Sequence, residues 1–150
     1  MGGNVRLFLA DISEITSFHL ASDIFSGNIT FAAGKGFYEL DCALQSIDAV
    51  VKPDGDFYNH QIKCVVPGVS IERDQILTNW KNTPIVVLRR DANGINTIHG
   101  HTNYPIYLTD WQRIESGTFS SLKSYAIEIQ SKPAIPTSAI PYNGFVTISY

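Results

Sequence analysis

The chain has few charged residues. Acidic and basic side chains make up 17% of its 150 residues, against about 25% in ordinary soluble domains. The longest basic run is Arg89-Arg90, which Asp91 follows at once, and the formal net charge is −3. A basic surface that grips nucleic acid is therefore not expected. Low charge is common among β proteins, which carry few Lys and Glu. It also favours a surface that is partly covered by partners.

Long apolar runs and cysteine motifs are missing as well. No stretch approaches the ~18 apolar residues of a membrane span, and the first apolar run stops at Asp11, too early for the core of a signal peptide. We expect a chain that is made and kept in a cytoplasm, with no membrane partner. Cys42 and Cys64 lack metal-ligand spacing and lie in apolar stretches, which predicts two buried small hydrophobic residues.

The sequence also lacks the common catalytic signatures. It has no Gly-x-Ser-x-Gly elbow, no phosphate-binding loop and no Gly-x-Gly-x-x-Gly. His99 and His101 stand two apart, which on a strand places both on one face and within reach of one metal ion. The same residues also fit the end of a strand and its turn, and we expect exposed turn histidines. The prediction is a protein that is not an enzyme and holds no metal or cofactor.

Turn signals recur every 10 to 15 residues, with short β-branched or aromatic runs between them. This spacing is typical of a β-sandwich or barrel, so the predicted fold class is mostly β with one packed helix. The run Ile85 to Leu88 is apolar at every position and predicts a central strand covered on both faces. The predicted strands are residues 5–12, 28–33, 37–51, 57–66, 84–90, 96–100, 104–108, 124–131 and 144–150.

One helix is expected at about residues 70–82. Ser70 is a good N-cap, Glu72 and Asp74 suit the positive end of the helix dipole, and Pro84 ends the helix. Trp80 lies on the apolar face and is expected to pack on the sheet. A weaker helix or coil is predicted at 12–23.

The chain is expected to form a domain at residues 1–132, with residues 133–150 as an extended Pro-rich arm plus the final strand of that same domain. Prolines keep the arm from regular pairing. Two arrangements remain open: the arm lies along a neighbouring subunit, or it crosses its own sandwich and delivers the last strand within the same chain.

The order of several segments resembles small structural proteins from the tail or head–tail module of phages and prophages of Bacteroidetes-type bacteria. The resemblance covers roughly residues 37–134. It is carried by the segments 37–41, 57–68, 71–80, 84–94, 98–100, 104–108, 124–129 and 132–134 taken in order. No single motif among them is specific.

The resemblance implies a virion protein of the tail-tube or head–tail connector kind, assembled in the bacterial host's cytoplasm. Such proteins form homo-oligomeric rings or tubes with other virion structural proteins, and DNA passes through the lumen without specific binding. The predicted interface residues are Trp111, Ile135, Ile140 and Phe145. The alternative is a β-sandwich that binds a carbohydrate or another ligand, with Trp111, Tyr104 and Tyr107 as its platform.

Overall fold

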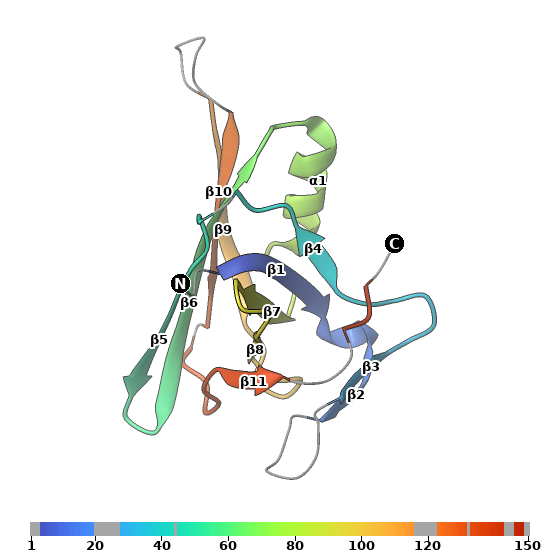
Figure 1. The fold of residues 1–150 in the computed structure, drawn as a ribbon, viewed down its shortest axis with the longest axis vertical. Helices are drawn as coiled ribbons and strands as arrows, with labels where there is room; N and C mark the ends of the chain where they lie inside the picture. Colours follow the sequence, from blue (N-terminus) through green and yellow to red (C-terminus); the bar gives the residue numbers. More distant parts are fainter. Residues whose placement is uncertain are drawn as a thin grey trace.

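The computed structural model of the chain is mostly β, with two main sheets, a separate hairpin and one α-helix (Figure 1). It describes residues 4–19, 28–43, 45–115, 123–131, 133–142 and 146–148. The predicted fold class, a β-sandwich or barrel with one packed helix, is confirmed.

The five-stranded sheet lies at the centre of the molecule. Its order is β11-β8-β7-β1-β4, and all of its pairs are antiparallel. The strands are β1 (Asn4–Asp11), β4 (Tyr38–Leu40), β7 (Ile85–Asp91), β8 (Asn96–His99) and β11 (Ile140–Tyr142).

The four-stranded sheet packs on one face of the central sheet, in the order β5-β6-β10-β9. Its strands are β5 (Asp48–Asp54), β6 (Phe57–Pro67), β9 (Tyr107–Ile114) and β10 (Ser124–Gln130). Along β6 and β10, every second side chain is buried and the others are more open, as expected of a sheet with one face in the core.

The apolar core is divided by the central sheet, because successive side chains on a strand point to opposite faces. Ile85 and Val87 join the cluster shared with the four-stranded sheet, whereas Val86 and Leu88 join a second cluster on the other face. All four side chains are fully buried, so the prediction of a central strand covered on both faces is confirmed.

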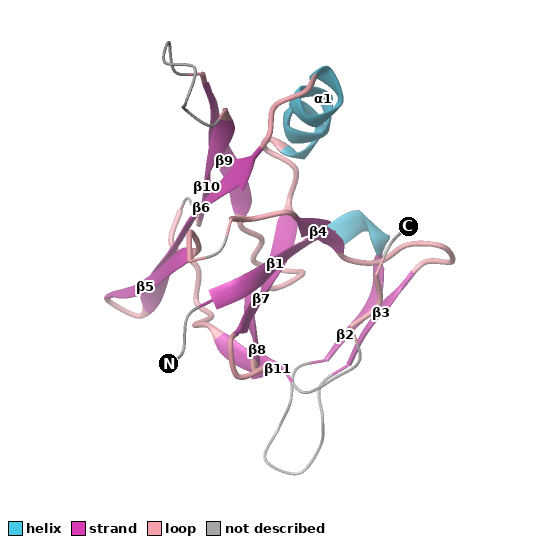
Figure 2. Ribbon diagram, turned by 45° about the horizontal axis from the view of Figure 1, so that its top comes forward, coloured by secondary structure: helices cyan, strands magenta, loops and turns pink. Residues whose placement is uncertain are grey.

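The second cluster is covered in part by the hairpin of β2 (Ile15–His19) and β3 (Asn28–Phe31), which stands beside β1 and apart from the four-stranded sheet (Figure 2). The weak helix or coil predicted at 12–23 was wrong at residues 15–19, which form a strand. A single 3-10 turn, Ile12–Glu14, is capped by the Asp11 side chain and leads directly into β2. The alternating Thr16 and Phe18 favour a strand once β3 is there to pair with it.

The helix α1 (Ile71–Trp80) forms where it was predicted. The Ser70 hydroxyl accepts a hydrogen bond from the Arg73 N–H at 3.1 Å, as an N-cap does. Leu77 is buried and Trp80 is half-buried, with its ring stacked on Tyr38 at 5.9 Å between centroids. The helix therefore closes one end of the space between the sheets.

The Pro-rich segment 133–142 crosses within its own chain. Ile135 exchanges two main-chain hydrogen bonds with Tyr58 on β6, of 2.7 and 3.0 Å, and Ile140–Tyr142 then pairs with β8 as β11. These contacts are those of the arrangement in which the arm crosses its own sandwich. The prolines still allow these contacts, because the segment pairs at short points instead of along one continuous strand.

The predicted final strand, 144–150, is described only at 146–148. There Ile148 forms a parallel bridge with Phe37, and the Phe37 N–H donates to the Thr147 carbonyl at 2.7 Å. The last described strand is thus β11, which lies earlier in the chain than predicted.

Candidate functional site

The outer face of the four-stranded sheet is a broad surface that the rest of the described chain leaves open. Strand register places one row of charged side chains across all four strands. Asp48 pairs with Lys63, Lys63 with Glu128, and Glu128 with Asp110. Three carboxylates therefore share this row with one ammonium group, and the face is acidic.

Neutral polar side chains flank this row. Gln61 and Gln130 both donate side-chain hydrogen bonds to the Glu128 carboxylate, the first at 3.4 Å. Val50, which is 54% exposed, and Tyr107 stand at the two ends of the next row, which runs Val50–Gln61–Gln130–Tyr107. The surface thus offers hydrogen-bonding groups and little positive charge.

The outer edge of β5 carries main-chain groups with no strand beside them among the described residues. Tyr58 and His60 on β6 direct their main-chain groups to Ile135 and Ser131, away from β5. Their β5 partners, Pro53 and Val51, therefore form non-hydrogen-bonded pairs and direct their own main-chain groups to the open edge. By the two-residue period, Ala49 does the same.

The opposite edge of this sheet is β9. The Asn82 N–H donates to the Leu108 carbonyl at 3.1 Å and covers the start of this edge. After Leu108, no other described strand lies beside it. All neighbours in the sheet are antiparallel, so β5 and β9, three strands apart, run in opposite directions. A β9 edge laid beside the β5 edge of a second copy would continue the antiparallel pattern.

The three predicted platform residues lie in different places. Trp111 faces inward, half-buried, with its ring edge-to-face on Tyr125 at 5.7 Å. Tyr107 lies on the outer face of the sheet beside Gln130, and Tyr104, 44% exposed, lies in the turn next to His101. The structure does not bring the three rings onto one surface.

The predicted interface residues divide in a similar way. Ile135 is buried in the core, and Ile140 is half-buried in β11. Trp111 packs against the core, as described above. Phe145 lies outside the described residues.

His99 is fully buried, and this corrects the expectation of an exposed turn histidine. It lies at the end of β8, under the four-stranded sheet, where its Nδ1 is 2.9 Å from Nδ1 of His60 on β6. Burial and the nearby Arg89 charge lower the pKa of His99 to about 3. His101, two residues on, is half-buried, and its Nδ1 accepts the Asn103 N–H at 3.0 Å.

The contact between His60 and His99 was missed in the sequence, although one signal for it was present. Ile62, Cys64 and Val66 point inward on β6, so the two-residue period places His60 inward as well. Nothing local indicates that His99 lies opposite it, because the contact joins two different sheets.

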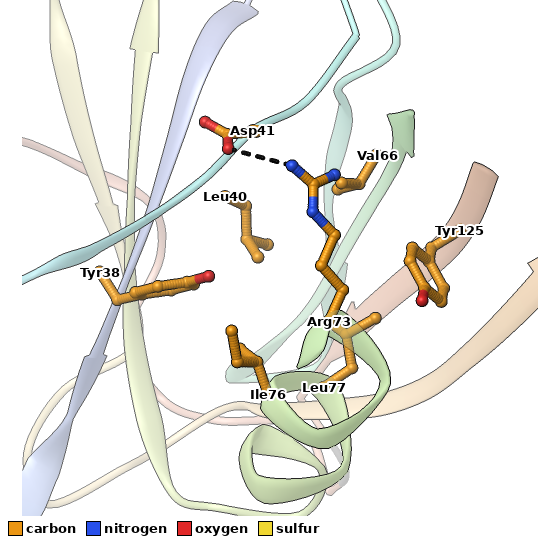
Figure 3. A pocket seen from close by; sticks show the side chains of 8 residues that line it. All are labelled: Tyr38, Leu40, Asp41, Val66, Arg73, Ile76, Leu77 and Tyr125. Atoms are coloured by element: carbon orange, nitrogen blue, oxygen red, sulfur yellow. Dashed lines mark ion pairs between the residues drawn. The ribbon is translucent and has the colours of Figure 1, made fainter. Parts of the chain in front are cut away.

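A hollow opens between α1, β4 and the ends of β6 and β10 (Figure 3). It holds about 310 Å³ of space, including its open mouth. The Tyr38 hydroxyl points into it, and Arg73 reaches across to Asp41 at 3.5 Å. Arg73 also donates to the Pro67 carbonyl at 2.5 Å, so its guanidinium is already well partnered.

Comparison with protein-family models, with curated proteins and with solved structures finds no match. Within the part of the chain that the structure describes, no three His, Cys, Asp or Glu side chains gather as metal ligands would. Across the same described ranges, no helix has the length and apolar character to cross a membrane.

Proposed function

We propose that the chain is a non-enzymatic structural subunit of a phage tail or head–tail junction, which assembles into a homo-oligomeric ring or tube. The observation that carries the proposal is the pair of open edges on the four-stranded sheet, β5 and β9, which run in opposite directions. Head-to-tail pairing of unlike edges repeats from copy to copy, and such contacts close into rings when the rotation allows it.

The outer face of the same sheet suits the inner wall of such a ring. Its central row holds Asp48, Glu128 and Asp110 against the single Lys63. A wall of this charge repels a phosphate backbone, so DNA would pass without being held. Other virion structural proteins would then contact the ends of the ring, in a particle assembled in the cytoplasm of the bacterial host.

A ligand-binding module is the second candidate, with its site moved from the predicted platform. The stacked rings of Tyr38 and Trp80 line a groove together with Asp11, Glu14 and Asn79. Aromatic faces beside carboxylate and amide groups are what a sugar ring needs for stacking and hydrogen bonding. A protein with this function would remain a monomer or dimer.

The test is to block the β5 edge without harming the subunit. Ala49→Pro removes an N–H that faces the open edge, so pairing within the chain keeps its hydrogen bonds. Val50→Thr, which alters only an exposed side chain on the same strand, is the matched control. Light scattering at equal concentration is expected to show oligomers for the wild type and Val50→Thr, and monomers for Ala49→Pro.

A folded Ala49→Pro variant that forms the same oligomer as the wild type would refute edge pairing. Oligosaccharide binding by a monomeric wild type, lost in Trp80→Ala, would favour the second candidate.

A further inference from the structure

A series of hydrogen bonds between four groups joins both sheets to the C-terminal segment. Arg89 on β7 donates from Nε to Nε2 of His99 at 2.7 Å. Nδ1 of His99 lies 2.9 Å from Nδ1 of His60, and Nε2 of His60 lies 2.7 Å from the Thr137 carbonyl. His60 and His99 are both buried.

The direction of every hydrogen bond in this series follows from Arg89, its first donor. Arg89 is always protonated and always donates, so Nε2 of His99 must accept. The proton of neutral His99 is then on Nδ1 and is donated to Nδ1 of His60. His60 in turn carries its own proton on Nε2 and donates it to Thr137. Only one pair of tautomers satisfies every contact, and in it both rings are neutral.

A proton added to either ring disrupts this series of hydrogen bonds. On His60 it would occupy Nδ1 and oppose the N–H of His99 across 2.9 Å. On His99 it would occupy Nε2 and oppose the Arg89 N–H across 2.7 Å. Donor-to-donor contacts at such distances are repulsive, and burial adds the cost of an unpaired charge.

We propose that the His60–His99 pair is an acid-sensitive latch, which holds the C-terminal segment 133–142 on the two sheets at neutral pH and releases it on protonation. The latch acts on this segment because its Thr137 carbonyl is bonded to His60. That hydrogen bond survives protonation of His60. Release follows because lifting the segment opens His60 to water, where the added charge is solvated and is no longer opposed by the His99 N–H. It does not depend on the proposed virion role.

Two features make segment 133–142 the part of the structure that detaches when the pair is protonated. It is held at separate points, through Ile135 on β6, Thr137 on His60 and β11 on β8, so no continuous ladder secures it. The buried Thr137 hydroxyl has no hydrogen-bond partner within the described residues, and seating it against the protein carries a desolvation cost.

The charges around the pair come from each element that packs on it. β7 supplies Arg89, and Asp91 at the end of that strand acts on Arg89. Lys52 of β5 does not face the pair, because the two-residue period places its side chain on the outer face of the sheet with Val50. Among the described residues, no carboxylate is hydrogen-bonded to either imidazole. The Thr137 carbonyl favours the charged form of His60, but burial outweighs it and lowers the pKa of His60. Burial and the Arg89 charge lower the pKa of His99.

The test is hydrogen–deuterium exchange on the full chain from pH 7 to pH 4, corrected for intrinsic exchange rates. Protection in peptides from 133–142 is expected to fall about tenfold per pH unit below pH 6, before protection in β6 and β10 falls. His60→Gln with His99→Asn, which has no titrating ring at either position, should flatten this dependence. His101→Asn, the control, should keep it, because His101 lies outside the chain of contacts.

Unchanged protection of 133–142 down to pH 4 in the wild type would overturn the proposal, and so would an unchanged pH dependence in the double variant. If the double variant fails to fold, ¹⁵N NMR of the wild-type histidines tests the proposal instead, because it reports which ring nitrogen carries the proton. The latch requires the proton on Nδ1 of His99 and on Nε2 of His60 at pH 7. A protonated ring in a chain whose 133–142 segment is still protected would contradict it.

Discussion

His60 and His99 face each other across the two sheets with their Nδ1 atoms 2.9 Å apart, and both side chains are buried. Because both rings must be neutral to keep this contact, the free energy of unfolding should depend on pH.

The stability of the chain should fall as the pH drops from 7 to 5. The folded pKa of each histidine lies below the unfolded value near 6.5, so below that pH the unfolded chain binds protons that the folded chain does not. The stabilisation is present above pH 6.5 and is lost on acidification, at roughly 1.4 kcal/mol per pH unit for His99, whose folded pKa is about 3. His60 adds a loss of the same sign. Urea titrations at pH 7, 6 and 5 measure it.

His101→Asn is the control for this titration, because His101 is more open and lies outside the histidine pair. It should leave most of the slope in place. A free energy of unfolding that stays constant between pH 7 and 5 in the wild type would show that the pair is not neutral in the folded chain.

Tyr125→Phe should destabilise the protein by about 1–3 kcal/mol. Tyr125 is fully buried, and its hydroxyl donates to the Asp74 carboxylate while lying 3.0 Å from the Ser70 carbonyl. Removing it leaves both helix groups without that partner. Tyr107→Phe, on the outer face of the sheet, is the control and should change little; equal melting temperatures for the two variants would refute the role of the Tyr125 hydroxyl.

The two cysteines should react slowly in the folded chain. Cys64 is buried, and a hydrogen bond with Cys64 together with burial raises the pKa of the Cys42 thiol far above its usual range. Because the thiolate is the reactive form, labelling with a thiol reagent at pH 7.5 should be slow in buffer and fast in urea. Labelling of Cys42 at the rate of a free thiol would contradict this contact.

Ile135→Ala should cost about 2–5 kcal/mol, because Ile135 is 6% exposed and belongs to the main core cluster. Ile71→Ala, at a site 74% exposed, is the matched control and should cost less than about 0.5 kcal/mol. The loss for Ile135→Ala should be the same at every protein concentration. A loss that appears only at concentrations where the chain oligomerises would place Ile135 in a contact between subunits.

Local signals in the sequence predicted local structure well. The Ser70 cap and Pro84 bracketed α1, and the unbroken apolar run from Ile85 predicted β7. The turn that follows β7 is formed by neighbouring residues in the same way. In the structure the Asp91 carboxylate accepts the N–H groups of Asn93 and Ile95, at 2.9 and 3.0 Å. Each of these features is decided by residues within a few positions of one another.

Features decided by distant partners were not predictable in this way. Residues 15–19 form a strand because β3 pairs with them. Ile135 is buried because its main chain is hydrogen-bonded to that of Tyr58 on β6. His99 is likewise buried because His60, 39 residues earlier, lies opposite it on the other sheet. The candidate assembly edges also follow from strand order, which no local pattern reveals.

Native mass spectrometry of the unmodified chain, over a range of concentrations, measures whether copies join edge to edge through β5 and β9 as proposed. Edge-to-edge pairing should give one dominant species at a fixed multiple, three or greater, of the 16.6 kDa subunit, as expected when unlike edges close a ring. A chain that stays at 16.6 kDa at every concentration would contradict it.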